Sequence, residues 1–265
     1  MATRKRKKRR VKKGFLIFSI LTSLVLILCL AFFAVVKFVP NINILPVKQV
    51  VVSGDQVYAS EQIVSVSEIS IGKSVLKYDL NNLENKLEKE LPYVKNANIS
   101  YSIDGTINIK IVATEVSYSV KTNDGYHNLD NDFKLLESSA QEKKGMQIYG
   151  IDLSRELHLG EVVVDKSDIR VVVLEKLVNK LNEFSIVADV IDLEDTNNIM
   201  FVYQGRYLVE VGNDGSLDEK MMMFNTISKD LPQNETGRIL LKHWSDEDRY
   251  GSVLAENVDE HLNKY

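Results

Sequence analysis

The sequence predicts an α+β protein with a single N-terminal transmembrane helix followed by two soluble units. Three observations support this prediction. Residues 15–36 contain no charged side chain, residues 47–115 follow the order strand, helix, helix, strand, strand, and residues 116–244 contain many strand patterns with helices between them. The first soluble unit is therefore expected to be a β-α-α-β-β domain, and the second a β-rich domain with covering helices.

Residues 15–36 are the predicted transmembrane helix. At a rise of ~1.5 Å per residue, an apolar segment of this length spans roughly the 30 Å hydrocarbon core of a bilayer. Cys29 is the only cysteine and lies within this segment, so an intramolecular disulfide and a thiol-based metal site are both excluded. The hydroxyls of Ser19 and Thr22 are expected to bond to carbonyls of their own helix rather than to a partner helix.

Residues 1–14 form a basic tail with nine cationic side chains and no acid, although the whole chain has a net charge of -4. Such residues beside a membrane span hold that end in the cytoplasm and attract anionic lipids, so no nucleic-acid partner is inferred. The N-terminus is therefore expected to be cytoplasmic and the C-terminus extracytoplasmic. A cleaved signal peptide is the alternative, but no small-x-small cleavage site follows before Pro40. The membrane-flanking cations are Arg4, Lys5, Arg6, Lys7, Lys8, Arg9, Arg10, Lys12 and Lys13.

The first soluble unit, residues 47–115, follows a linker at residues 37–46. Residues 47–53 are rich in β-branched side chains and stop at Gly54, as a strand does. Ser60 is predicted to cap a short helix. Asp79 is predicted to cap a second helix, which Pro92 ends. The second helix has a core-facing stripe at Leu80, Leu83, Leu87 and Leu91.

Two alternating segments complete this unit. Ala97, Ile99 and Tyr101 alternate with polar residues, and Asp104-Gly105 is a signal for a two-residue hairpin. The returning strand carries its apolar residues at Ile107, Ile109 and Ile111. The two strands are therefore expected to pair directly.

A basic tail, a single anchor and a β-α-α-β-β unit together resemble the bacterial cell-division family FtsQ/DivIB, whose first extracytoplasmic domain is a POTRA domain. The resemblance lies in VKQVVVSGDQVYASEQIV at residues 47–64 and LEKELPYVKNANISYSIDGTINIKIVATEVSYSV at residues 87–120. Val116 replaces the Pro that often follows Glu115 in the family. The resemblance implies a POTRA domain at residues 47–115 and a β domain at residues 116–244.

Within the second unit, YHNLDNDFKLL at residues 126–136 resembles the family's paired strand and turn, with Asp132 where a Gly is usual. A helix is predicted from the stripe Ile169, Val173, Leu177, Leu181 and Phe184. Strands are predicted at residues 187–193, 199–203 and 207–211, and Ser216-x-x-Glu219 is predicted to open a further helix as a capping box. That helix carries Met221, Met222 and Met223, which are expected to be core residues with one exposed member. Residues 245–265 are charged and poorly periodic, so a flexible C-terminal tail is expected.

No constellation points to catalysis, a cofactor or a metal. Two S-x-x-K matches, beginning at Ser70 and Ser74, lack the S-D-N and K-T-G partners of penicillin-binding enzymes. The histidines are scattered without ligand spacing. Acid pairs such as Asp130 with Asp132 and Asp192 with Glu194 are expected to serve solubility and turns. We therefore expect no enzyme and no cofactor.

An exposed sheet edge is the most useful feature of such a protein, because a partner strand can extend it through main-chain hydrogen bonds. The resemblance implies that the last strand of the β domain binds a membrane-anchored coiled-coil partner of the DivIC/FtsB type, which an FtsL-type protein joins. The corresponding candidate residues are Ile239, Leu240, Leu241, Lys242, His243 and Trp244, with Leu240 where many members have Asp. Trp244 fits an interface anchor and a core residue equally well.

The resulting interpretation is a non-enzymatic, bitopic protein of the division septum that binds and stabilises septal membrane partners, possible wall-synthesis enzymes included. One alternative is a POTRA-type module for polypeptide transport or assembly, although such systems repeat the unit and attach it to a barrel. A membrane-anchored cell-wall enzyme that uses an S-x-x-K match is the other alternative.

Overall fold

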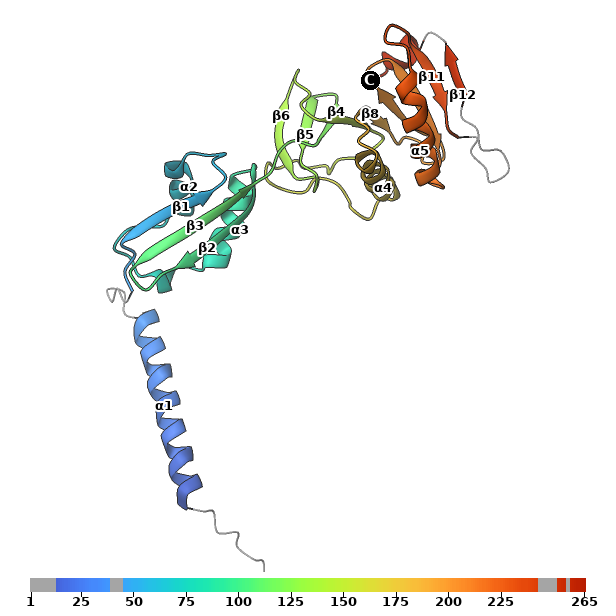
Figure 1. The fold of residues 1–265 in the computed structure, drawn as a ribbon. Helices are drawn as coiled ribbons and strands as arrows, with labels where there is room; N and C mark the ends of the chain where they lie inside the picture. Colours follow the sequence, from blue (N-terminus) through green and yellow to red (C-terminus); the bar gives the residue numbers. More distant parts are fainter. Residues whose placement is uncertain (1–12, 39–44, 243–251, 256–257) are drawn as a thin grey trace, which may run out of the picture.

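The computed structural model describes residues 13–38, 45–242, 252–255 and 258–265. Helix α1 (Lys13–Phe38) is followed by two folded units that lie one after the other along the chain (Figure 1). The first unit contains a three-stranded sheet and the second a nine-stranded sheet. The fold is therefore α+β, as the sequence predicts.

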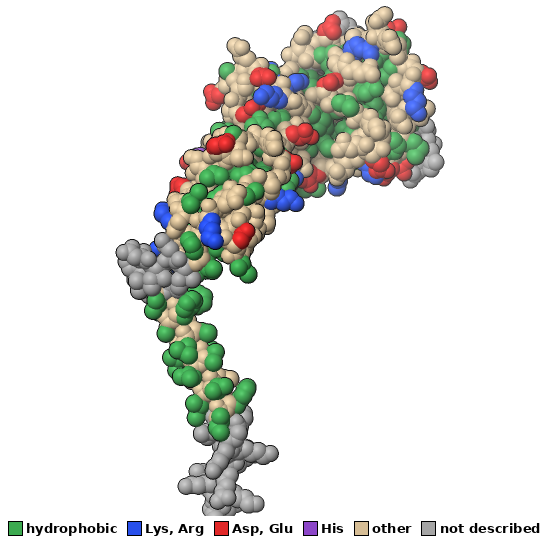
Figure 2. Space-filling view, turned by 60° about the vertical axis from the view of Figure 1, so that its left-hand side comes forward, with side chains coloured by type: hydrophobic (Ala, Val, Ile, Leu, Met, Phe, Trp, Pro, Cys, Tyr) green, Lys and Arg blue, Asp and Glu red, His purple; other side chains and the backbone are tan. Residues whose placement is uncertain are grey.

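Helix α1 is the one described helix that is long and apolar enough to cross a bilayer. Its residues Ile17–Val35 have a mean hydropathy of 2.7 and none is buried within the protein. Hydrophobic side chains line its surface in Figure 2. The hydroxyl of Thr22 donates to the carbonyl of Ser19 at 3.0 Å, so this hydroxyl is satisfied within its own helix, as expected.

The first unit places two helices against its sheet. Its elements are β1 (Gln49–Gly54), α2 (Ser60–Ser67), the 3-10 turn η1 (Val75–Lys77), α3 (Leu80–Glu90), β2 (Val94–Tyr101) and β3 (Thr106–Ala113). Strand β3 is central, with β1 parallel on one side and β2 antiparallel on the other. Leu87 of α3 and Ile107, Ile109 and Ile111 of β3 are almost fully buried, which confirms the predicted leucine stripe and alternation.

Local details of this unit differ in two places from the prediction. Asp79 caps α3 as predicted, since its carboxylate accepts from the Asn82 amide at 3.2 Å. The N-cap of α2 is instead Ala59, so Ser60 is its first helical residue and the predicted cap is wrong. The connection from β2 to β3 is the four-residue segment 102–105, in which Gly105 has φ +100°, rather than a two-residue hairpin.

The second unit is built on one continuous mixed sheet. Its strands are β4 (Tyr118–Thr122), β5 (Gly125–Leu129), β6 (Leu135–Ser139), β7 (Met146–Tyr149), β8 (Ala188–Asp192), β9 (Ile199–Tyr203), β10 (Tyr207–Gly212), β11 (Gly237–Leu240) and β12 (Ser252–Ala255). The spatial order is β12-β11-β10-β9-β8-β7-β4-β5-β6. The left-handed turn position between β5 and β6 is Phe133, with φ +64°, and not Asp132.

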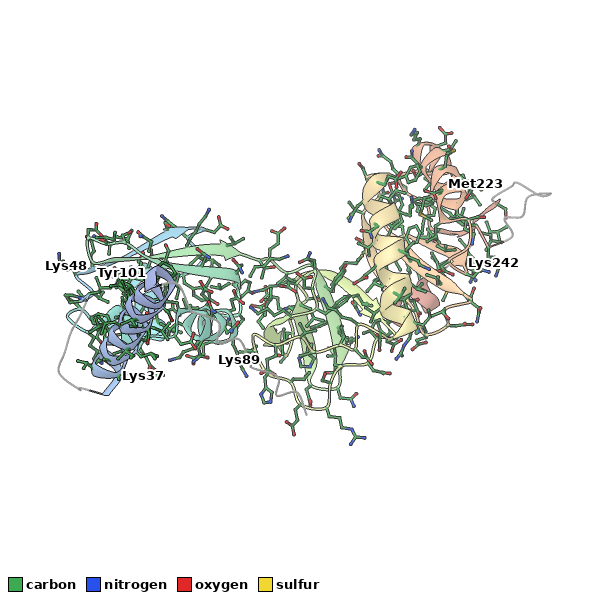
Figure 3. The ribbon with its side chains drawn as sticks, turned by 90° about the horizontal axis from the view of Figure 1, so that it is seen from below. Lys37, Lys48, Lys89, Tyr101, Met223 and Lys242 are labelled. Atoms are coloured by element: carbon green, nitrogen blue, oxygen red, sulfur yellow. The ribbon has the colours of Figure 1, made fainter. Side chains whose placement is uncertain are left out.

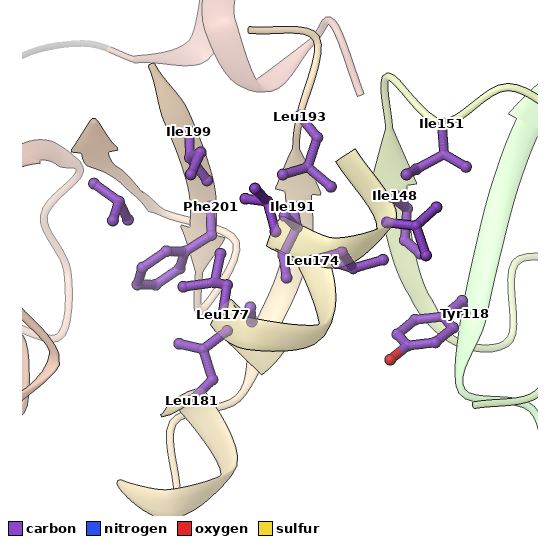
Figure 4. Packing of buried hydrophobic residues seen from close by; sticks show 14 of the residues in the cluster. Tyr118, Ile148, Ile151, Leu174, Leu177, Leu181, Ile191, Leu193, Ile199 and Phe201 are labelled. Atoms are coloured by element: carbon purple, nitrogen blue, oxygen red, sulfur yellow. The ribbon is translucent and has the colours of Figure 1, made fainter. Parts of the chain in front are cut away.

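Helices α4 (Ile169–Glu183) and α5 (Leu217–Ile227) contribute to the main core of the second unit, and the 3-10 turn η2 (Ser228–Asp230) follows α5. Leu174, Leu177 and Leu181 of α4 pack over Ile191 and Phe201 of β8 and β9 (Figure 4). Because strand side chains alternate between faces, their neighbours Val190 and Val202 point to the other face of the sheet.

The two predicted helices are present with local corrections. Ile169, a member of the predicted buried stripe, is 61% exposed. Ser216 makes no side-chain cap and has φ +52°, so the predicted capping box does not form. Met221 is buried and Met222 is exposed, as expected of a core stripe with one outward member.

The expectation of a loosely ordered tail at residues 245–265 is wrong for its described parts. Strand β12 pairs antiparallel with β11, and the short helix α6 (Asp259–Leu262) follows it. Val258 is fully buried against Val190, Val202 and Leu208 on the sheet face opposite α4. The second unit therefore extends beyond residue 244, because the apolar side chains of this segment pack on the sheet face opposite α4.

Candidate partner-binding surfaces

Strand β11, the predicted docking strand, is an inner strand. It pairs parallel with β10 on one side and antiparallel with β12 on the other. Ile239 and Leu241 are fully buried, Leu240 is half-buried and Lys242 is exposed. His243 and Trp244 lie outside the described residues. The backbone of β11 is therefore already paired along both sides, and it leaves no edge for an added strand.

A buried carboxylate holds the end of this strand. Glu210 of β10 is only 2% exposed and forms ion pairs with Arg238 and Lys242 on the adjacent chain segment. Burial opposes ionisation, but the hydrogen bonds and charges of Lys242 and Arg238 outweigh it and lower the pKa of Glu210. Lys242, one of the predicted site residues, thus has a structural role in fixing β11 to β10.

Strand β12 is one edge of the nine-stranded sheet, and β6 is the other. The four residues of β12 pair with residues 237–240, and within the described part of the chain no strand lies on its outer side. Val253 and Leu254 are 46% and 42% exposed, so the strand displays apolar side chains beside unpaired backbone groups. Such an edge is a template for a further strand.

The sequence does contain a signal for β12 that composition obscures. Gly251 precedes a short run of Ser, Val, Leu and Ala, and Val258 and Leu262 follow at helical spacing. These apolar residues are diluted by acids and amides, so that the average character of residues 245–265 is that of a tail. When hydrophobicity is instead assessed over windows of about four to eight residues, the strand is distinguished from its charged flanking residues.

The junction between the two units is polar and closely fitted. Lys134 of the second unit donates from Nζ to the carbonyls of Glu88 at 2.5 Å and Val94 at 2.7 Å in the first unit. Burial lowers the pKa of Lys134, with nearby carboxylates opposing the shift. The hydroxyl of Tyr93 donates to Glu137 at 2.9 Å. The carbonyl of Glu88 belongs to the last turn of α3, where it has no partner within the helix, so Lys134 caps α3 from the other unit.

Further ion pairs surround this junction. Lys95 contacts Asp132 at 2.9 Å, and Lys89 pairs with Glu161 at the end of the first unit nearest the second (Figure 3). Gly160 allows the close approach, because a Cβ at this residue would lie 2.0 Å from the carbonyl oxygen of Lys89. The exit from the first unit is thus held by side chains, even though Val116 replaces a stiffening Pro.

The basic membrane-flanking residues are described only at their last member. Lys13 is the first residue of α1, and Arg4, Lys5, Arg6, Lys7, Lys8, Arg9, Arg10 and Lys12 lie outside the described residues.

Two of the residues considered for enzyme chemistry, Ser74 and His127, have structural roles in the described part of the chain. Ser74, the serine of one S-x-x-K match, is fully buried beside η1 and is inaccessible as a nucleophile. Both ring nitrogens of His127 contact hydroxyls, those of Thr122 and Ser138, and burial lowers its pKa. Among the described residues, no group of three or more His, Cys, Asp and Glu side chains is arranged to hold a metal.

A groove of about 550 Å³ lies between α4 and the beginnings of β4, β7 and β8. Asn131, Asn179 and Asn182 contribute amides and Glu175 a carboxylate to its lining. No sequence pattern reveals this groove, because it forms only when these segments pack together. Its side chains do not converge on a recognisable ligand chemistry.

Comparisons with known proteins agree with the fold of the first unit. A family profile described as a POTRA domain of the FtsQ type matches residues 45–112. A cell division protein DivIB of Clostridium tetani is 28% identical over 181 residues, which cover 66% of each chain. A cell division protein DivIB of Clostridium acetobutylicum is 26% identical over 106 residues, which cover 40% of this chain and 42% of the relative. The matched regions thus span less than two thirds of each relative's length.

Proposed function

We propose that this chain, which belongs to the DivIB/FtsQ family of cell-division proteins, is a non-enzymatic, single-pass membrane protein that binds and stabilises partners at the division septum. The observation that carries the proposal is the edge strand β12, with Val253 and Leu254 half exposed beside an unpaired backbone. The described residues supply a binding edge and no cluster of catalytic groups, so assembly is the function that they support best.

The anchor sets the compartment in this proposal. The basic tail before α1 favours a cytoplasmic N-terminus, since Lys and Arg beside a span are retained on that side. The two soluble units then face the extracytoplasmic space. Tethering at the membrane raises their effective concentration toward other anchored proteins, so a modest docking edge suffices.

The partner is an extended segment of a membrane-anchored coiled-coil protein of the DivIC/FtsB type, joined by an FtsL-type protein. Strand addition gives affinity through main-chain hydrogen bonds, and the alternating side chains of the edge strand contribute specificity. We therefore propose β12 as the docking site in place of residues 239–244, because both sides of β11 are already paired. Apolar Val253 and Leu254 call for apolar side chains in the added strand.

The test is a pull-down or bacterial two-hybrid assay with the full chain and a DivIC/FtsB-type partner. The double variant Val253→Lys with Leu254→Lys places charge on the edge while altering only half-exposed side chains, and should weaken binding by about tenfold or more. Ile103→Lys is the matched control, because Ile103 is a 95% exposed apolar residue in a turn of the first unit. Undiminished binding by the edge variant would contradict the docking edge.

A further inference from the structure

Strand β12 is a short edge strand. It is four residues long, pairs on one side only within the described residues, and leaves Val253 and Leu254 half exposed. Short edge strands that bury little surface open locally at low cost. The segment C-terminal to β12 is therefore the place to look for contacts that stabilise this strand.

This C-terminal segment is anchored by apolar contacts. Val258 lies three residues beyond β12 and is fully buried, while Leu262 and Tyr265 pack around the same patch. The patch comprises Tyr149, Val190, Met200, Val202 and Leu208, all on the sheet face opposite α4. Tyr265 also meets Tyr149 edge to face, with ring centroids 5.0 Å apart and an interplanar angle of 73°.

A buried carboxylate adds a polar lock. Asp192, at the end of β8, is only 2% exposed. Its Oδ2 accepts from Lys264 Nζ at 2.8 Å and from the Tyr265 hydroxyl at 2.9 Å. Lys264 Nζ also contacts Glu194 Oε2 at 2.7 Å, and the Lys264 carbonyl accepts from the Tyr149 hydroxyl at 2.8 Å.

These contacts give the acid pair Asp192 and Glu194 a structural role. Apart from a turn contact to the Glu194 amide at 3.0 Å, the hydrogen bonds described for the Asp192 side chain come from residues 264 and 265. A buried carboxylate without a charged partner is costly, so the strand end of β8 favours the docked position of residues 264 and 265. The lock therefore ties the chain beyond β12 to the middle of the sheet.

We propose that residues 258–265 form a latch, here called the C-terminal latch, which fastens the edge strand β12 and thereby keeps the docking edge in register. The latch residues are positioning residues, since they lie on the sheet face and act on the edge through the chain that joins them to β12. This inference rests on the proposed function for its consequence, namely that opening the latch weakens partner docking. The fastening itself is independent of any partner.

The first experiment measures hydrogen exchange of backbone amides in the full chain in detergent micelles. Lys264→Met with Tyr265→Phe removes the ammonium and the hydroxyl but keeps most of the packing. Exchange at residues 252–255 should become about tenfold faster or more, while β2 and β3 in the first unit stay protected. Lys229→Met is the matched control, because Lys229 is exposed on η2 and should leave all rates unchanged. Unchanged protection of β12 in the double variant overturns the latch.

A double-mutant cycle tests the lock directly. Lys264→Met alone leaves Asp192 buried without its charged partner, whereas Asp192→Asn with Lys264→Met removes both charges. The double variant should therefore lose less protection at β12 than the sum of the two single variants. Strict additivity would show that the pair does not act as a unit and would overturn the lock.

Partner binding then separates this inference from the proposed function. The latch variant should bind a DivIC/FtsB-type partner about tenfold more weakly or worse, in step with the loosening of β12. Loosened β12 with wild-type affinity would overturn the role of the latch in docking. If the Val253 and Leu254 edge variant also binds normally, or the unaltered chain does not bind at all, the proposal that β12 is the docking edge is wrong. The exchange rates still decide in that case whether the latch fastens β12.

Discussion

Lys134→Met should uncouple the two soluble units. The Nζ of Lys134 donates to the carbonyls of Glu88 at 2.5 Å and Val94 at 2.7 Å, and methionine keeps the length of the side chain without its donors. A hydrogen bond to a charged group contributes roughly 1.5–3 kcal/mol. The desolvation that lowers the pKa of Lys134 offsets part of this gain. We therefore expect a net loss of about 2–3 kcal/mol of coupling, or roughly 30- to 160-fold in the equilibrium between docked and undocked units.

Spin labels at two exposed positions would measure this change. Ile71 in the first unit is 71% exposed and Val187 in the second is 76% exposed, so labels at both positions should leave the cores intact. Cys29 is replaced by serine to keep the labelling specific. The unaltered junction should give a narrow distance distribution and Lys134→Met a broad one. Lys143→Met, which alters an exposed lysine of the second unit, is the control.

A Lys134→Met distribution as narrow as that of the control would refute the role of this lysine. The remaining contacts, Tyr93 with Glu137 and Lys95 with Asp132, would then hold the junction without the cap on α3. A broad distribution in both variants would show instead that the loosening is not specific to the contacts of Lys134. Each result separates the specific cap from general electrostatics.

Three further predictions concern pH, the buried carboxylate and topology. Burial, then the hydrogen bond and charge of Glu137, raise the pKa of Tyr93 from 10.0 to about 12. The stabilisation that the protonated Tyr93 hydroxyl contributes should therefore be complete below pH 10 and decline up to about pH 12. Alkaline unfolding should show this loss in the unaltered chain and not in Tyr93→Phe. Glu210→Gln should lower the free energy of unfolding in urea by about 2–3 kcal/mol, because it removes the ion pairs that Glu210 forms with Arg238 and Lys242. This difference should shrink at acid pH, as Glu210 becomes protonated at a pH below the usual pKa of a glutamate. A reporter enzyme that is active only outside the cytoplasm should be active when fused after residue 265, and inactive if the cations of the basic tail are replaced and the orientation inverts.

The first unit could be predicted in detail because its signals are local and agree with one another. The stripe that includes Leu87, the cap at Asp79 and the alternation around Ile109 are each contained within one element, and all three point to the same buried surface. The capping errors have a physical reason. A serine before a helix caps it only with an extended backbone, and Ser216 has φ +52° after a turn in which the Asn213 side chain accepts from the Gly215 amide.

The sequence does not predict which strand forms the docking edge, because an edge is a property of the assembled sheet. The apolar pattern of residues 237–241 correctly indicates a strand. Whether that strand has a free side depends on residues 252–255, which pair with it. These residues lie within residues 245–265, whose composition predicts a flexible tail. Long-range pairing of this kind leaves no periodic signal in either strand alone.

The structural role of the acid pairs could not be predicted for a similar reason. Asp192 and Glu194 stand beside a turn, and the local sequence contains no cation to pair with them. Their partner, Lys264, is 72 and 70 residues away along the chain. Asp132 likewise meets Lys95 only across the junction of the two units. In each case the partner is brought close by the fold, so that only the structure distinguishes a buried lock from a solvated loop.

The junction and the C-terminal latch act in series between the membrane and the docking edge. Lys134 fixes the second unit on the first, and the Asp192 lock fixes β12 on the second unit, so the edge is presented by a chain of held elements. A tether alone raises the local concentration of a binding site, but a site that must also be ordered loses affinity to conformational entropy. Opening either element should therefore weaken docking even when Val253 and Leu254 are unchanged. Opening both should weaken it by the sum of the two free energies, because the contacts of the two elements share no residue.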